Sequence, residues 1–387
     1  MTRRRVAVAL VSVLAGVSPA PAQEVTGSLR TGLYSDDDST TVWRSLAAVD
    51  AAWSAWHLFI KESVDVISSA SIDVRMSPQL DAVTSASRIE MSDTRFETTV
   101  GTSHDDGHGH IVALSGVFAL EGEYQSYGLG VSGSYDFEGR LTTLLGSASF
   151  NHNIVGSAFD HGFAKNLESV SYTVGIARVV GASDALRLRY DGQIFSGYQA
   201  SPYRSVRFGD WSVSESARGA LVFSGTIDSP LGLAENMPSL RVRHAAVLEW
   251  IHGFSDTLGA LATVRLSDDS WNVRGLTAGA DLRFSPGSWL LRGGYRYYLQ
   301  GAADFFEDKY VMAPSSYDHY TSDKELGDER GHIGSADASY GFRNFPSNGK
   351  TTWLDLQLDV LHYDYLGFTL LPSRTSVFGE IGVRLGF

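Results

Sequence analysis

Charged side chains recur at every second position in several segments of this sequence. In segment 185–198, Arg187, Arg189 and Asp191 alternate with leucine and tyrosine. Successive residues of a β-strand point to opposite faces, so such a segment predicts one charged face and one apolar face. We predict that the charged faces line the inside of a closed sheet, with these members: Arg187, Arg189, Arg241, Arg243, Arg283, Arg292, Arg296, Asp281, Asp355, Asp359, Glu380 and Arg384.

The predicted lining has an uneven distribution of charge. Arginines predominate in 185–299, and carboxylates predominate in 333–387. Opposed charged walls would create a transverse field that orients solutes in a pore. Alternatively, the charges pair with one another and stiffen or close the interior. We favour ion pairing, because charged side chains that leave bulk water need partners.

Three further groups of residues have the composition of metal or catalytic sites. Segment 63–74, with Asp65 and Asp73, offers oxygen ligands for calcium, but it lacks the ligand spacing of a calcium loop. Segment 104–110 offers three histidines for zinc, but it has no second anchoring segment. Adjacent Asp318 and His319 resemble a hydrolytic dyad, although neighbours on a loop rarely have the required geometry. We therefore predict no catalytic residue, no metal and no cofactor.

Segment 301–331 is too long for a turn and is rich in aromatic and acidic residues. Long ordered loops often carry function. We expect this segment to fold over a pore and narrow it, with its carboxylates near the row of Arg292 and Arg296. The candidate constriction residues are Asp304, Phe305, Phe306, Glu307 and Asp308.

The two ends of the chain have the patterns of an export signal and of an assembly signal. Residues 1–22 combine three early arginines, a short apolar stretch and Ala20-Pro21-Ala22, which predicts a signal peptide cleaved after Ala22. Residues 377–387 alternate between apolar and polar or glycine positions and end on Phe387. This ending resembles the terminal assembly signal of bacterial outer-membrane barrels. We expect Phe387 to act as that signal for the barrel-assembly machinery.

Alternating segments of about ten residues, bounded by turn residues, predict the strands. Sixteen are predicted, with fourteen as the lower count: 26–34, 40–50, 54–67, 88–101, 109–122, 124–137, 141–152, 168–180, 185–198, 240–251, 256–267, 275–285, 288–299, 333–344, 352–364 and 374–387. Every even-numbered connection is short, and all the long ones are odd-numbered. This alternation predicts an all-β, up-and-down antiparallel transmembrane barrel with short periplasmic turns and both termini in the periplasm. Residues 23–387 form its single domain.

Composition excludes several other classes of protein. No stretch after residue 22 reaches eighteen apolar residues, so helical membrane spans are excluded. The formal charge of −13 is unsuited to nucleic-acid binding. The chain has no cysteine, so disulfides and thiolate metal sites are impossible.

Five strings resemble a family of uncharacterised outer-membrane proteins, domain-of-unknown-function family 3570. They are VDVISSASIDV (64–74), SGYQASPYR (196–204), LRVRHA (240–245), YRYYLQGAADFF (295–306) and YTSDKELG (320–327). The resemblance extends over about 30–387 and implies an outer-membrane barrel without implying an activity.

Together these features predict a Gram-negative outer-membrane barrel, surrounded by lipid and lipopolysaccharide, that acts as a passive channel for small solutes or ions. The alternative is a closed barrel that serves as a surface scaffold or as the outer-membrane part of an envelope complex. An enzyme is not expected, and the sequence does not identify a solute.

Overall fold

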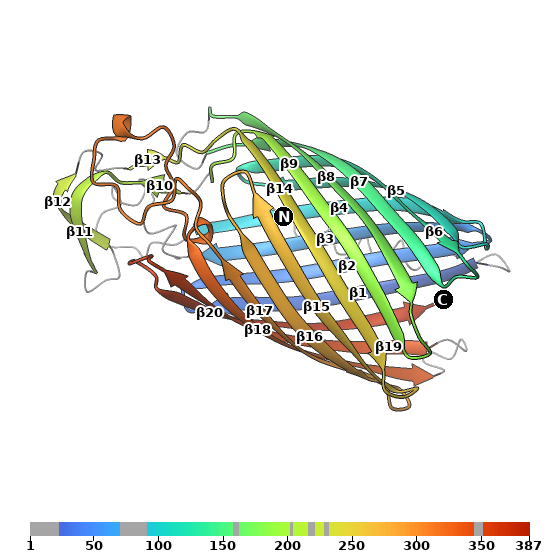
Figure 1. Cartoon of the computed structure of the whole chain (residues 1–387). Helices are drawn as coiled ribbons and strands as arrows, with labels where there is room; N and C mark the ends of the chain where they lie inside the picture. Colours follow the sequence, from blue (N-terminus) through green and yellow to red (C-terminus); the bar gives the residue numbers. More distant parts are fainter. Residues whose placement is uncertain are drawn as a thin grey trace, which may run out of the picture.

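The protein is described by a computed structural model that covers residues 23–69, 91–157, 162–201, 204–215, 221–227, 232–343 and 351–387. Within these ranges, sixteen antiparallel strands close into a single barrel, which confirms the predicted fold (Figure 1). The signal peptide predicted for residues 1–22 lies outside the described residues. No helix in the described part of the chain is long and apolar enough to cross a membrane.

Each barrel strand pairs with its neighbour in the sequence, and the first strand pairs with the last. The strands are β1 (Gln23–Asp36), β2 (Thr40–Trp53), β3 (Trp56–Ser69), β4 (Met91–Asp105), β5 (His110–Glu121), β6 (Tyr124–Phe137), β7 (Thr142–Val155), β8 (Lys165–Val179), β9 (Asp184–Gly197), β14 (Leu240–Gly253), β15 (Leu258–Asp269), β16 (Gly275–Phe284), β17 (Trp289–Gln300), β18 (Asp328–Arg343), β19 (Thr351–Leu366) and β20 (Ser373–Gly386). All sixteen overlap the predicted segments. The start of β18 is five residues earlier than expected, because Glu329 and its neighbours continue the pairing with β17 without alternating apolar residues.

The connections alternate in length as the sequence predicts. Short turns such as 106–109 and 285–288 join the strands at one end, and the long connections 198–239 and 301–327 lie at the other. Gly287 has a φ of 62°, a left-handed conformation that glycine adopts without strain and that a tight hairpin turn requires. The predicted short connection at 345–350 lies outside the described residues.

The outer face of the barrel is covered by large apolar side chains. Leu29, Leu129 and Leu188 are 62%, 73% and 55% exposed, and comparable residues follow at alternate positions on neighbouring strands. We call this outward surface the apolar belt. Trp53, Trp56, Trp250 and Trp289, which lie beside short turns, are also exposed, at the edge of this belt. A continuous apolar surface of this kind is stable only when it is removed from water, as in a lipid bilayer.

Pairing between β1 and β20 closes the barrel. Eleven residue pairs, from Thr26–Gly386 to Asp36–Ser376, form this seam. The backbone N–H of Phe387 donates to the Val25 carbonyl oxygen at 2.7 Å, which extends the pairing to the last residue. Both ends of the barrel domain therefore lie at the end with the short turns.

The long connections contain structure that the sequence pattern did not predict. In 198–239, β10 (Ser205–Val206) pairs with β13 (Leu233–Ala234), and β11 (Gly209–Glu215) pairs with β12 (Leu221–Ile227). In 301–327, two short 3-10 helices, η1 (Pro314–Ser316) and η2 (Lys324–Leu326), interrupt an otherwise irregular path. Figure 1 shows both connections together at one end of the barrel. We call the described parts of 198–239 together with 301–327 the cap.

Candidate functional site

The structure places the twelve charged residues predicted as lining on the face opposite the apolar belt. Cross-strand partners share a face of a sheet, and the register puts Arg187 opposite Glu249 and Arg283 opposite Arg292. Their sequence neighbours Leu188 and Leu282 are 55% and 57% exposed on the outer surface. Residues facing the interior that the sequence reasoning missed include Arg30, Arg44, Lys61 and Arg265, although each lies in an alternating segment.

Ion pairs neutralise the inner wall on β19, β20 and β1. Arg384 donates two hydrogen bonds to Asp355, at 2.7 and 2.8 Å. Arg30 contacts Glu380 at 3.2 Å and Asp355 at 3.8 Å. Asp359 accepts a hydrogen bond from Gln357 at 2.6 Å. The carboxylates of this wall therefore have cations or an amide as neighbours, so the ion-pair interpretation applies here.

Several arginines elsewhere on the inner wall are also paired. Arg187 contacts Glu249 at 3.1 Å, and Arg44 contacts Asp65 at 2.8 Å. Arg292 bridges Asp281 at 2.7 Å and Asp337 at 2.8 Å. On β14, Arg241 contacts Asp269 at 2.5 Å and lies over the Trp271 ring at 4.2 Å from its centre. These pairs link neighbouring strands and stiffen the barrel.

Four inward arginines differ from the rest of the wall. Within the described residues, Arg243, Arg265, Arg283 and Arg296 make neither an ion pair nor a side-chain hydrogen bond. They come from four consecutive strands, β14 to β17. Arg283 and Arg296 are exposed, and Arg243 and Arg265 are half-buried. The inner wall on this side therefore carries four positive charges that no ion pair among the described residues neutralises.

A hollow of about 520 Å³ lies in the same part of the inner wall. It is lined by five arginines and three carboxylates: Arg189, Arg265, Arg283, Arg292, Arg296, Glu249, Asp281 and Glu329. Tyr298 and Tyr363 add aromatic surface. The arrangement offers cationic donors and an aromatic face to a small solute.

The cap has an aromatic core formed by segments about a hundred residues apart in the sequence. Phe208 and Tyr310 are fully buried, and Phe208 also stacks edge-on against Tyr320. The Tyr310 hydroxyl donates to the Phe305 carbonyl oxygen at 2.6 Å and accepts from the Thr321 N–H at 2.9 Å. Burial raises the pKa of this phenol well above its ordinary value. The two long connections are thus packed into one folded unit.

A buried carboxylate also joins the two connections within the cap. Glu235 accepts a hydrogen bond from the Thr321 hydroxyl at 2.6 Å and another from the Ser201 N–H at 3.2 Å. Burial, opposed by the positive charge of Arg204 and reinforced by the negative charge of Asp323, raises the pKa of Glu235 to about 7. The protonation of this group is therefore sensitive to pH near neutrality.

The cap rests on the inner rim of the barrel. Phe306 packs against the buried cluster of Tyr365 and Phe368, which the inward residue Tyr363 also contacts. The inward amide of Gln300 donates to the carbonyl oxygens of Glu325 and Gly327, at 2.9 and 3.1 Å. These contacts put segment 301–327 at the mouth, on the side of β17 to β19.

The predicted approach of Asp304 and Asp308 to the row of Arg292 and Arg296 is wrong. Asp304 accepts from the Asn272 amide at 2.9 Å, and Asp308 accepts from the Thr369 N–H at 3.0 Å. Arg292 lies near the other end of β17 and pairs with Asp281 and Asp337. Asp304 and Asp308 therefore bind rim connections, whereas Glu325 of the same segment contacts Arg374 of β20 at 3.7 Å.

The other candidate sites form turns and packing contacts. In 104–110, Asp106 accepts from the backbone N–H groups of His108 and His110, and the rings of His104 and His110 pack on Trp56 and Tyr135. Segment 104–110 thus forms a strand end and a hairpin turn stabilised by Asp106. Asp73 lies outside the described residues. Among the residues that the structure describes, no cluster of three or more histidines or carboxylates is placed to hold a metal ion.

Asp318 and His319, the possible dyad of segment 301–331, contact different neighbours. The Asp318 carbonyl oxygen accepts a hydrogen bond from Asn236 at 2.8 Å. The His319 ring packs on Phe305, with 6.1 Å between ring centres. In the described part of the chain, no hydrogen bond joins Asp318 to His319, so the pair lacks the contact that a hydrolytic dyad requires.

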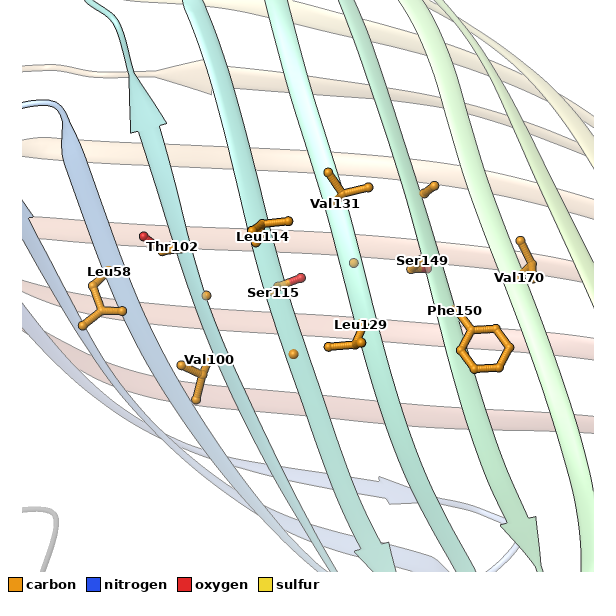
Figure 2. A pocket seen from close by; sticks show the side chains of 14 residues that line it. Leu58, Val100, Thr102, Leu114, Ser115, Leu129, Val131, Ser149, Phe150 and Val170 are labelled. Carbon is orange, nitrogen blue, oxygen red and sulfur yellow. The ribbon is translucent and has the colours of Figure 1, made fainter.

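A groove of about 710 Å³ lies on the outer wall across β3 to β8. Figure 2 shows Leu114, Leu129 and Phe150 on three neighbouring strands that line it. Gly116 leaves room at its centre, because its position in the apolar belt has no side chain. This surface is apolar and belongs to the belt, so we do not include it in the candidate site.

Solved structures with a similar arrangement include three barrels from Pseudomonas. The siderophore receptor PirA from Pseudomonas aeruginosa is 9% identical with a TM-score of 0.43, and the match covers 90% of this chain but only 57% of that chain. The toluene transporter TodX from P. putida is 10% identical with a TM-score of 0.41, covering 95% and 91%. OprD from Pseudomonas aeruginosa is 8% identical with a TM-score of 0.44, covering 94% and 95%.

No curated protein matches this sequence. A family model does match it, over residues 66–334, and its description is "Protein of unknown function (DUF3570)". The matched region runs from β3 into β18 and includes the inner wall with the four unpaired arginines and the whole cap. The chain belongs to this family of unknown function.

Proposed function

We propose that the protein is an outer-membrane channel of a Gram-negative bacterium that passes small solutes or ions. The observation that carries the proposal is the contrast between the two faces of one closed barrel. The outer face is the apolar belt, and the inner face carries charged groups, of which four arginines have no partner. Barrels of sixteen strands are wide enough to leave an aqueous channel.

The proposal includes an orientation in the membrane. The short turns and both ends of the barrel domain face the periplasm, and the cap faces outward among lipopolysaccharide. Bacterial outer-membrane barrels have short periplasmic turns and long external loops, and the connections here alternate in that way. Residues 1–22 direct export and are removed, and the barrel-assembly machinery reads the strand that ends at Phe387.

The cap supports a second candidate function, a closed barrel that serves as a surface scaffold or as part of an envelope complex. Segment 301–327 has its own apolar clusters and packs on inward aromatic residues at the mouth. A solute would have to pass beside this unit. The scaffold therefore differs from the channel in one measurable property, which is the absence of ion flow.

Conductance in planar lipid bilayers tests the two candidates. The folded, purified barrel is added to one side, and stepwise current increases of uniform size are expected. A sample unfolded by heat is the control, because it retains the sequence and loses the barrel. If the folded protein inserts without producing current steps, the channel proposal fails and the scaffold is favoured.

A further inference from the structure

We propose that the four unpaired arginines of the inner wall form a binding track for small oxyanions, meaning solutes that carry a carboxylate or a phosphate. The track consists of Arg243, Arg265, Arg283 and Arg296. The inference rests on the proposed channel and names the class of solute that this channel would take. It begins from the difference between these four residues and the other arginines of the same wall.

The other inward arginines have carboxylate neighbours at short distances. Arg30, Arg44, Arg187, Arg241, Arg292 and Arg384 each contact an aspartate or glutamate within 3.2 Å. A wall with a purely structural role would pair its charges in this way throughout. On β14 to β17 the pairing is incomplete, and the unpaired charges are all positive.

Local geometry explains why partners are missing. Asp269 lies across the strand pair from Arg243, but it is occupied by Arg241 and by the backbone N–H groups of Trp271 and Val273. Arg283 lies directly opposite another arginine, Arg292. Like charges in opposite positions of a strand pair destabilise a sheet. An anion bound between them would remove this repulsion.

The four residues follow one another along the wall. In the strand register, Arg243 of β14 lies opposite Asp269 of β15. Arg265 lies on β15 as well, four residues further from the cap than Asp269. Arg265 lies opposite Thr277 of β16. Arg296 of β17 lies opposite Gly279, which is two residues beyond Thr277 on β16, and Arg283 is six residues beyond Thr277 on the same strand. At about 3.3 Å per residue, the track extends for about 33 Å along the strands. It therefore leads from the capped mouth to the end with the short turns.

Arginine suits this class of ligand. Its planar guanidinium group donates two parallel hydrogen bonds to a carboxylate or phosphate and is more weakly hydrated than an ammonium group. Conduction needs binding that is favourable enough for entry and weak enough for exit. Exposed and half-buried arginines at successive levels provide several weak sites in series. Three of the four arginines, Arg265, Arg283 and Arg296, line one hollow of about 520 Å³, where a solute can contact them.

Ion selectivity tests the track directly. In bilayers with a potassium chloride gradient, we expect a reversal potential that favours chloride over potassium. In the double variant Arg265→Gln with Arg296→Gln, the preference for chloride over potassium should be several-fold weaker. Millimolar phosphate or benzoate should reduce the chloride current of the unmodified protein, and the stronger of the two identifies the preferred headgroup. A current that favours potassium would overturn the proposal.

Lys61 provides a matched control. It faces the interior from β3, makes no ion pair with the described residues, and lies eight strands away from β15 around a barrel of sixteen. Lys61→Gln removes the same kind of charge from the opposite wall. The double variant removes two charges from the track, and the resulting change in selectivity should be far more than twice the change caused by Lys61→Gln. Equal effects per charge would show that net charge alone sets the selectivity, and the track would be rejected.

Binding in detergent separates the failure of the track from the failure of the channel. We would measure the midpoint of thermal unfolding in phosphate and in chloride at equal ionic strength. Ligands that bind only the folded state raise this midpoint. A higher midpoint in phosphate, absent in the double variant, would support the track even without current. Current without chloride preference, together with equal midpoints, would reject the track and leave the channel in place.

Discussion

At the scale of single residues, Glu235 gives the cap a dependence on pH. Burial raises its pKa to about 7, because it disfavours the charged carboxylate more than the hydrogen bonds from Thr321 and Ser201 favour it. The folded cap thus binds the proton more tightly than the unfolded segment does. The protonated group stabilises the folded cap fully at a pH below the ordinary pKa of a glutamate. This stabilisation is lost as the pH rises toward 7, and the loss is at most about 3 kcal/mol.

We therefore predict that the cap opens more readily at pH 8 than at pH 5. The rate at which a protease cuts segment 198–239 in the folded barrel measures this opening. Glu235→Gln should weaken the pH dependence of the rate, because the amide retains an acceptor for Thr321 and does not titrate. Glu307→Gln, at an exposed carboxylate of the same cap, should leave the pH dependence unchanged. Faster cutting at pH 5 would contradict the prediction.

Phe387 is the second residue whose removal is informative. Its N–H continues the seam by donating to the Val25 carbonyl oxygen, and its aromatic ring is the expected recognition element for assembly. Deletion of Phe387 should lower the amount of folded barrel in the outer membrane, as measured by heat-modifiable mobility on gels. Phe387→Tyr keeps the ring and should assemble normally. Normal levels of folded deletion variant would refute the assigned role.

At the scale of elements, the register of β19 determines which side chains meet lipid. Leu358 lies in the middle of the strand and is 49% exposed in the apolar belt, whereas Gln357 faces the interior and bonds Asp359. Leu358→Arg should destabilise the barrel by about 2–4 kcal/mol, the cost of arginine at the bilayer midplane. Gln357→Arg should cost far less. Urea unfolding in lipid vesicles measures both, and equal losses would indicate a register shift of one residue.

Segment 301–327 is the element most directly placed to limit permeation. We predict that replacing 305–327 with a short glycine–serine linker leaves a folded barrel with larger single-channel conductance, because Phe306 and its neighbours leave the inner rim. Removal of the β11–β12 hairpin, which belongs to the other connection, is the control and should change conductance little. Unchanged conductance after loss of 305–327 would place this segment outside the permeation path.

The barrel strands could be predicted from sequence because their signal is local. Alternation within about ten residues identifies each strand, and turn residues mark the limits between them. The cap could not be predicted in this way, since its core depends on contacts such as Phe208 with Tyr310, which no local period encodes. The partners of the inward arginines depend on register between strands. Arg292 meets Asp337 only because Trp289 pairs with Tyr340.

At the scale of the whole molecule, orientation in the membrane is directly testable. The chain has no cysteine, so single cysteines can be introduced without background. Ser316→Cys in the cap should react with a membrane-impermeant maleimide on intact cells. Ser288→Cys, in the short turn between β16 and β17, should react only after the outer membrane is opened. The opposite pattern of labelling would invert the proposed topology.

The seam between β1 and β20 also has a consequence for the order of events in folding. Arg30 and Glu380 meet across it although they are 350 residues apart in the sequence. The entropy of closing a loop grows slowly with length, so closing this one costs only about 2–3 kcal/mol more than closing a hairpin of twenty residues. The eleven pairs of the seam can offset that cost, but only after the ribosome has released the final strand. Until then, both edges of the sheet are open to pairing with other chains, and the proposed export in an unfolded state, followed by closure in the membrane, would avoid this hazard.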